Sequence, residues 1–283
     1  MAQSLREIKS RIRGIGNVNK VTHAMEMISI AKLRPVKNRL FPARRYSLKI
    51  DELLRNLSAG TKGVSHPFME QRENIKRIAI CLVTSDTGLC GSYNNNAVRV
   101  VEDFINRYGH DKITLFPVGR KGLVYFKKKG VDMAGACTEL HGRYSDDMIN
   151  KISKDLTRIF LSKAADEIYI VYASFESASR SKPVIERLLP VSVSPGRETG
   201  YIFEPDVNTI LKELMPLYLA NKIKSCILSA FTAEHSARAI AMGQATENAK
   251  ELLEDLTLVR NKIRQAGITK DIMEIVSSAD VLK

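Results

Sequence analysis

The chain lacks the features that would place it inside a membrane or on an export pathway. No apolar run approaches the ~18 residues that a membrane span needs, and the opening stretch MAQSLREIKS has no signal-peptide core. An apolar content of 44% is ordinary for a folded protein. We therefore expect a chain that is cytosolic or peripheral on a membrane complex, with no direct membrane insertion.

Metal and disulfide patterns are also missing. The four cysteines include no C-x-x-C pair, and the five histidines show no H-x-x-x-H spacing. Widely separated cysteines are typical of buried, reduced thiols rather than of a disulfide framework or a metal site. The sequence therefore predicts neither a metal nor a cofactor.

Catalytic motifs are equally scarce. The stretch TSDTGLCGSYNNN, residues 84–96, reads as a strand-to-helix turn, which can cradle a phosphate. It nevertheless lacks both G-x-G-x-x-G and G-x-x-x-x-G-K-[ST], and no serine lies in a G-x-S-x-G elbow. Paired acids such as Asp146 and Asp147 are typical of a solvated helix face. We expect no catalytic site in this chain.

Positive charge is concentrated at the start of the chain. The net charge is +13, and residues 1–50 hold twelve lysines and arginines against only Glu7 and Glu26. Such a segment can bind nucleic acid, an anionic membrane surface or an acidic protein. Phe41 and Tyr46 are the only aromatic residues among these fifty, so base stacking has little to work with.

The last part of the chain carries a helical apolar repeat. Apolar residues recur at steps of three and four over residues 242–266, which predicts a coiled-coil seam. The seam residues are Met242, Ala245, Ala249, Leu252, Leu256, Val259, Ile263 and Ala266. The next position is Lys270, although the helical pattern continues to about Ala279. We expect the end of this helix to project alone into another protein.

The first segment carries a second helical stripe. It comprises Leu5, Ile8, Ile12 and Ile15 and then, after a small change of phase, Val18, Val21, Met25 and Ile28. Gly14 and Gly16 weaken this helix by roughly 1 kcal/mol each relative to alanine. Pro35 predicts a break or kink near Leu33, with the helix resuming after Pro42 and ending near Leu57.

Between these ends the pattern is that of a small α/β domain. Short apolar, β-rich runs at 77–85, 112–119, 131–137, 167–175 and 184–191 alternate with helical runs at 94–109, 122–130 and 145–165. Alternation of this kind predicts a largely parallel sheet. Residues 58–74 read as a linker, and residues 192–206 are rich in turn formers.

The length of the last helix decides the architecture. From Val207 onward it would span ~110 Å, which exceeds the diameter of a small domain and requires a partner along its seam. We predict an antiparallel two-helix coiled coil built from residues 1–57 and 207–283. A small Rossmann-like α/β domain, residues 76–193, is inserted between the two helices.

Several motifs in order resemble the gamma subunit of the F-type rotary ATP synthase over the whole chain. SLREIKSRI and MEM with AKLR, from Met25 to Arg34, are similar to the first helix of that family, and TSDTGLCGSYN to its S-D-R-G-L-C-G turn. The segment YIFEPD is similar to the opening of its last helix. MPLYLANKI, SAFTAEHSARAIAM, ATENA and LVRNKIRQAGITKDIMEIV resemble the helix itself.

The resemblance implies a rotor shaft without a catalytic site of its own. In that family the coiled coil lies inside a ring of three alpha and three beta subunits, and the foot rests on the membrane rotor ring (c-ring) with the epsilon subunit. Ion flow turns the ring, and the shaft drives the catalytic sites of the beta subunits. The implied location is peripheral, on the cytoplasmic face of a bacterial plasma membrane. The basic first segment would meet an acidic loop of the beta subunits.

The resemblance also implies individual contacts. Arg264, Gln265 and Thr269 match positions that bind loops of the surrounding catalytic subunits, and Met25, Lys32 and Arg238 match shaft positions sensitive for coupling. Tyr201 and Glu204 match the region of the foot that touches the rotor ring.

Departures from the family pattern are Thr87 in place of a basic residue, Pro35 after Arg34, and the glycine pair in the first helix. Two other interpretations remain open. A basic coiled coil would bind nucleic acid with strong salt dependence, but this leaves the C-terminal motifs unexplained. The α/β domain would alternatively be a nucleotide-using enzyme.

Overall fold

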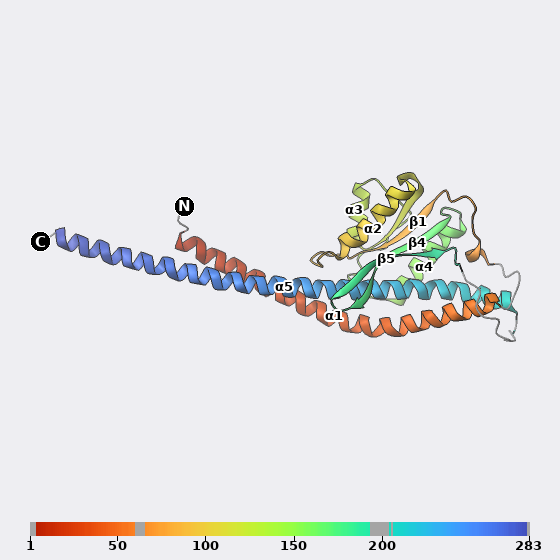
Figure 1. Ribbon diagram of the computed structural model, residues 1–283, viewed down its shortest axis with the longest axis horizontal. Helices are drawn as coiled ribbons and strands as arrows, with labels where there is room; N and C mark the ends of the chain where they lie inside the picture. The colour runs from red at the N-terminus through yellow and green to blue at the C-terminus, as the bar shows by residue number, and fades with distance from the viewer. Residues whose placement is uncertain (1–3, 60–65, 193–203, 205, 282–283) are drawn as a thin grey trace. The chain divides into compact units, whose positions relative to one another are not determined.

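The computed structural model describes residues 4–59, 66–192, 204 and 206–281 (Figure 1). The chain divides into two compact units. One comprises Met1–Ile28 with Ala239–Lys283, and the other comprises Ser29–Arg238. Helices α1 (Leu5–Ala59) and α5 (Val207–Val281) contribute residues to both units.

Helix α1 is continuous through both of its prolines, so the break expected at Pro35 was wrong. A proline inside a helix removes one backbone hydrogen bond and costs ~3 kcal/mol. Val36 and Leu40 are buried beside the two prolines. Burial of such side chains contributes about 1.5–3 kcal/mol each and offsets the loss. A kink without a break at Pro35 stays a prediction.

The seam of α1 keeps one phase along its length. Buried or partly buried residues recur at alternating steps of four and three, which is the repeat of a coiled coil. The expected stripe through Val18, Val21 and Ile28 was wrong, because all three side chains are at least half exposed. The observed seam positions are Ile8, Ile12, Ile15, Asn19, Thr22, Glu26, Ser29, Leu33, Val36, Leu40, Ala43, Ser47, Ile50, Leu54 and Leu57.

The predicted and observed seam positions of α5 coincide at every seventh residue, beginning with Met242. The seam positions between these residues differ from the predicted ones. Leu252 and Val259 are 43% and 39% exposed, so placing them in the seam was wrong, as it was for the exposed Ala266. The step after Met242 is four residues rather than three. The observed positions are Met242, Thr246, Ala249, Leu253, Leu256, Arg260 and Ile263.

Contacts between the two helices run in opposite chain directions. The Asn19 side-chain amide donates to the Thr246 carbonyl at 3.0 Å, and a Cβ placed on Gly243 would lie 3.2 Å from a Glu26 carboxylate oxygen. The residue numbers rise on α1 as they fall on α5. The predicted antiparallel two-helix coiled coil is therefore confirmed.

The inserted domain contains a five-stranded sheet with the order β3-β2-β1-β4-β5. Its strands are β1 (Ile78–Val83), β2 (Ile113–Val118), β3 (Asp132–Met133), β4 (Glu167–Ser177) and β5 (Arg180–Leu189). All pairs are parallel except β4 with β5. Its helices are α2 (Tyr93–Tyr108), α3 (Arg120–Lys128) and α4 (Asp146–Leu161), with 3₁₀ turns η1 (Pro67–Met69) and η2 (His110–Lys112). The α/β expectation is confirmed.

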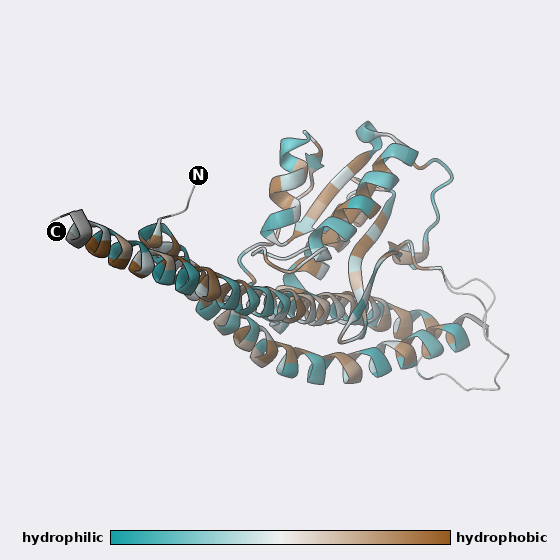
Figure 2. Cartoon of the chain, turned by 60° about the vertical axis from the view of Figure 1, so that its left-hand side comes forward, coloured by the Kyte–Doolittle hydropathy of each residue, from teal (hydrophilic) through white to brown (hydrophobic). Residues whose placement is uncertain are grey.

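Alternate residues of β1 enter two separate cores, because successive side chains of a strand point to opposite faces. Ile78, Ile80 and Leu82 pack with residues of α2 and α3. Ala79, Cys81 and Val83 pack with residues of α1, α4 and α5. Figure 2 shows apolar residues, in brown, along the strands of the sheet. Both faces of the sheet are covered, as a parallel sheet requires.

Gly119, which follows β2, offers a direct test of this packing. Its φ is +102°, and a Cβ at this position would lie 2.1 Å from the Thr84 carbonyl oxygen. We expect Gly119→Ala to lower the free energy of unfolding by at least about 2 kcal/mol more than Gly109→Ala, because forced overpacking adds to the backbone cost. Urea unfolding of the purified chain measures both values.

Gly109 is the matched control. Its backbone angles, φ 93° and ψ 142°, are close to the φ 102° and ψ 144° of Gly119. No atom lies within 4 Å of a Cβ placed there. Equal losses in the two variants would show that the close approach to Thr84 is not real.

Candidate functional site

Helix α5 occupies the place where open α/β sheets usually hold a ligand. That place lies beyond the carboxyl ends of the strands, where the strand order reverses. Here the order reverses at β1, and the turn that follows β1 is bonded to Arg238 of α5. The Arg238 guanidinium donates to the Thr87 carbonyl at 3.1 Å, the Thr87 hydroxyl at 3.2 Å and the Gly88 carbonyl at 3.3 Å.

The backbone N–H groups at the start of α3 are used by the protein itself. Those of Arg120 and Lys121 donate to the Asp86 carboxylate at 2.9 Å and the Ser85 carbonyl at 3.0 Å. That of Gly122 donates to the Thr84 hydroxyl at 2.9 Å. A phosphate cradle needs N–H groups that face the ligand. These three are therefore not available to an anion.

A buried ion pair lies at the centre of the α5 junction. The Arg238 guanidinium lies 2.8 Å from the Glu234 carboxylate, and both side chains are less than a tenth exposed. Burial raises the pKa of Glu234, and the positive charges of Arg238 and Lys32 oppose that rise. The charges of Lys32 and Arg238, which the resemblance named together as shaft positions, therefore both favour the ionised form of this carboxylate. Breaking a buried pair of this kind typically costs 3–5 kcal/mol.

His235 is enclosed next to this ion pair. Its Nε2 atom lies 3.1 Å from the Gly142 carbonyl oxygen, so the neutral ring carries its proton on Nε2. Burial lowers its pKa to about 4. Gly142 has a φ of +65°, and a Cβ there would lie 2.6 Å from the ring. The glycine is required for this close approach.

The hairpin between β4 and β5 is bonded to both long helices. The Arg44 guanidinium donates to the Phe175 carbonyl at 2.8 Å and the Ser229 hydroxyl at 2.9 Å. The Phe175 N–H donates to the same hydroxyl at 2.9 Å. Ser236 donates to the Ala178 carbonyl. Together with Arg238, these bonds attach α5 to separate segments of the α/β domain.

The last part of α5 is exposed. All residues from Arg264 to Ser278 are exposed, including Gln265 and Thr269. Figure 1 shows α5 continuing past the start of α1. The large exposed apolar residues here are Ile268, Ile272, Met273, Ile275 and Val276, at 51–70%. An exposed apolar patch of this kind marks a surface for a partner.

The remaining residues named from the sequence lie apart. Met25 is partly buried on α1, one residue before the seam position Glu26. Glu204 is exposed, and Tyr201 lies outside the described residues. Arg238 is thus bonded to Glu234 and to the turn after β1, whereas Arg264, Gln265 and Thr269 lie together on the exposed end of α5.

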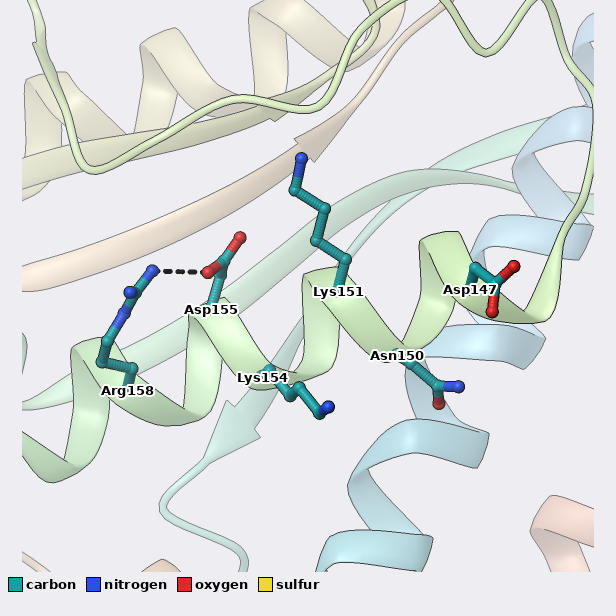
Figure 3. A pocket seen from close by; sticks show the side chains of 6 residues that line it. All are labelled: Asp147, Asn150, Lys151, Lys154, Asp155 and Arg158. Atoms are coloured by element: carbon teal, nitrogen blue, oxygen red, sulfur yellow. Dashed lines mark hydrogen bonds and ion pairs between the residues drawn. The ribbon is translucent and has the colours of Figure 1, made fainter.

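A surface hollow of about 510 Å³ lies along α4, and Figure 3 shows its side chains. Lys151 and Asn150 point in opposite directions, and Arg158 pairs with its neighbour Asp155 on the same helix. The charges alternate and do not converge on one point. This hollow is a solvated helix face, which agrees with the interpretation of Asp147.

Sequence reasoning missed Glu234, His235, Arg44 and Ser229. A usable signal was present for Glu234, because Glu234 and Arg238 are four residues apart in a segment that, apart from His235, is made of small or apolar residues. The sequence held no such signal for Arg44 or Ser229, since their contacts join residues far apart in the chain. In the described residues, no group of three or more possible ligands could hold a metal, and no helix is long and apolar enough to cross a bilayer.

The chain is similar to known proteins over its whole length. A family model described as ATP synthase matches residues 4–282. The ATP synthase gamma chain of Heliobacterium modesticaldum is 37% identical over 98% of this chain and 99% of its own length. That of Moorella thermoacetica is 36% identical over 99% of both.

Solved structures share the fold at lower identity. The match to a chain of the Euglena gracilis mitochondrial ATP synthase in rotational state 3 has a TM-score of 0.71 at 16% identity, over 98% of this chain and 94% of that one. The match to a chain of the central stalk and c-ring of the Tetrahymena thermophila enzyme has a TM-score of 0.61 at 20% identity, over 80% and 99%.

The depressed pKa of His235 predicts a pH dependence. Because the folded-state pKa of about 4 lies below the ordinary 6.5, the contribution to stability is present above pH 6.5 and is lost as pH falls towards 4. We expect His235→Gln to reduce the loss of unfolding free energy between these pH values by roughly 3 kcal/mol at most. Urea unfolding at several pH values measures this loss.

His110→Gln is the control, because it makes the same chemical change at an exposed position. Its pH profile should follow that of the unmodified chain. An unchanged profile in His235→Gln would contradict the assignment of a buried neutral imidazole.

Proposed function

Because the chain belongs to the ATP synthase gamma chain family, we propose that it is the central shaft of a rotary ATP synthase. It couples ion flow through a membrane rotor ring to ATP synthesis and hydrolysis in a surrounding ring of alpha and beta subunits. Catalysis belongs to the beta subunits. This chain supplies the mechanical link.

The observation that carries the proposal is the unequal extent of the paired helices. The seam of α5 ends at Ile263, and the residues that follow expose apolar side chains on a helix that has no partner among the residues that the structure describes. An isolated helix of this kind is poorly stabilised in water. A surrounding protein ring would bury these side chains. A single helix is also asymmetric, and only contacts that differ between subunits can favour different states of those subunits.

Exposed or partly exposed side chains of the two long helices would make the contacts with the ring of alpha and beta subunits. Arg264, Gln265 and Thr269 are exposed on the same end of α5 and present side-chain donors to loops of the catalytic subunits. Lys32 and Met25 are partly exposed and lie within reach of a partner. Arg238 is buried, so it influences coupling through the turn that it binds.

The α/β domain is the foot in this proposal. Glu204, together with Tyr201, would contact the rotor ring, and the epsilon subunit would lie beside them. The complex would sit on the cytoplasmic face of a bacterial plasma membrane. The twelve basic residues of the first segment would attract acidic loops of the beta subunits.

A nucleotide-using enzyme is the weaker alternative, because α5 occupies the end of the sheet where a nucleotide would bind. Co-expression with cognate alpha and beta subunits tests the main proposal. We expect one copy of this chain for three alpha and three beta subunits, and an ATPase rate that depends on it. Failure to co-purify with an assembled alpha and beta ring would reject the proposal.

Truncation after Ile263 tests the role of the exposed end. Since no large side chain beyond this residue is buried in the described part of α5, we expect the melting temperature of the isolated chain to change little. The number of ions pumped per ATP hydrolysed by reconstituted complexes should fall, because the contacts with the catalytic ring are lost. Uptake of the transported ion, proton or sodium, into vesicles and phosphate release measure this ratio.

A full-length variant separates loss of length from loss of apolar contacts. Ile272→Gln with Ile275→Gln keeps the helix but removes two exposed apolar side chains. It should lower the same ratio by a smaller amount. Unchanged pumping per ATP in both variants would contradict the assigned role.

A further inference from the structure

Over one stretch of α1, polar side chains lie inside the seam and apolar side chains lie outside it. Asn19, Thr22 and Glu26 occupy seam positions. Val18 and Val21 on the same turns are 50% and 58% exposed. Exposing apolar groups and burying polar ones both oppose folding. The arrangement therefore requires a specific interaction that favours it.

Asn19 and Thr22 of α1 and Thr246 of α5 form a set of hydrogen bonds, two of which join the helices. The Asn19 amide donates to the Thr246 carbonyl at 3.0 Å. The Thr246 and Thr22 hydroxyls lie 2.9 Å apart, the Thr246 hydroxyl also lies 2.8 Å from the Met242 carbonyl of its own helix, and the Thr22 hydroxyl lies 3.1 Å from the Asn19 carbonyl. Thr246 is 4% exposed, and Asn19 and Thr22 are partly buried; this set is here called the Asn–Thr ring.

A competing arrangement lies one residue away. The exposed residues Val18, Val21 and Ile28 each precede a seam position, namely Asn19, Thr22 and Ser29. Turning α1 about its axis by the angle of one residue, about 100°, would bring these apolar side chains towards α5. Over residues 18–28 apolar burial favours that turned state, whereas burial of Ile8, Ile12 and Ile15 earlier in α1 opposes it. The Asn–Thr ring would be broken in it.

We propose that the Asn–Thr ring fixes the rotational setting of α1 on α5. A polar residue at a seam position of a coiled coil specifies one arrangement at some cost in stability. The next seam position of α1, Glu26, is consistent with the same rotational setting. Gly243 has no side chain, and a Cβ there would lie 3.2 Å from the Glu26 carboxylate, so the glycine leaves room for Glu26 inside the pair.

The setting has a consequence that rests on the proposed function. It turns Val18, Val21 and Ile28 outward, where they meet the surrounding catalytic ring. The rotational setting itself is a property of the isolated chain. Its test therefore needs no ATPase and no partner subunit, and its failure is distinguishable from failure of the proposed function.

Thiol labelling of the purified full-length chain measures the setting. Ile15→Cys reports a seam position, Val21→Cys reports an outward position, and the four native cysteines are buried. Each reporter is compared with and without Thr246→Val, which removes the hydroxyl at constant size. We expect the ratio of maleimide labelling rates, seam over outward, to rise about fivefold, equivalent to about 1 kcal/mol, with slower labelling at position 21.

Thr257→Val is the matched control, because it makes the same change at a partly exposed position of α5 outside the ring. The ratio should stay constant in that background. An unchanged ratio in Thr246→Val would overturn the proposal. So would faster labelling at both reporters together with the native cysteines, because that result indicates loosening rather than rotation.

Discussion

Burial of α5 on two different surfaces holds the structure together. Within the unit formed by Ser29–Arg238, Ile223, Ile227 and Phe231 enter the same core as the sheet residues Ala79 and Cys81. Within the other unit, α5 is paired with α1 through a repeat of about 3.5 residues. One continuous helix thus carries both the attachment of the α/β domain and the coiled coil.

The α/β domain has the layout of a ligand-binding sheet, but α5 is bonded to the turn where such sheets usually hold a ligand. Its turn after β1 binds Arg238, and its hairpin between β4 and β5 binds Arg44 and Ser229. Contacts spread along a helix resist both rotation and sliding, because each bond must break for the helix to move. Such an attachment suits a domain that passes torque to a helix.

Much of the fold was predictable because local signals agreed with the tertiary structure. Short β-rich runs predicted the five strands that the structure describes, and the order of the sequence motifs predicted the family. The seam was misassigned at Val18, Val21, Leu252 and Val259, since apolar residues there occur on two adjacent stripes and α1 uses the more polar one over residues 18–29. The prediction of a break at Pro35 was wrong, because burial of neighbouring side chains offsets the cost of a proline inside a helix. For the candidate site, exposure of Arg264, Gln265 and Thr269 could be expected where the seam ended.

The sequence by itself determined the order of elements, the two helical repeats and the family, because these depend on residue types at short spacing. Only the tertiary structure decided which stripe of α1 faces α5 and which residues surround Glu234. Those choices depend on hydrogen bonds such as that between Asn19 and Thr246, 227 residues apart. No short-range pattern encodes a bond over that separation.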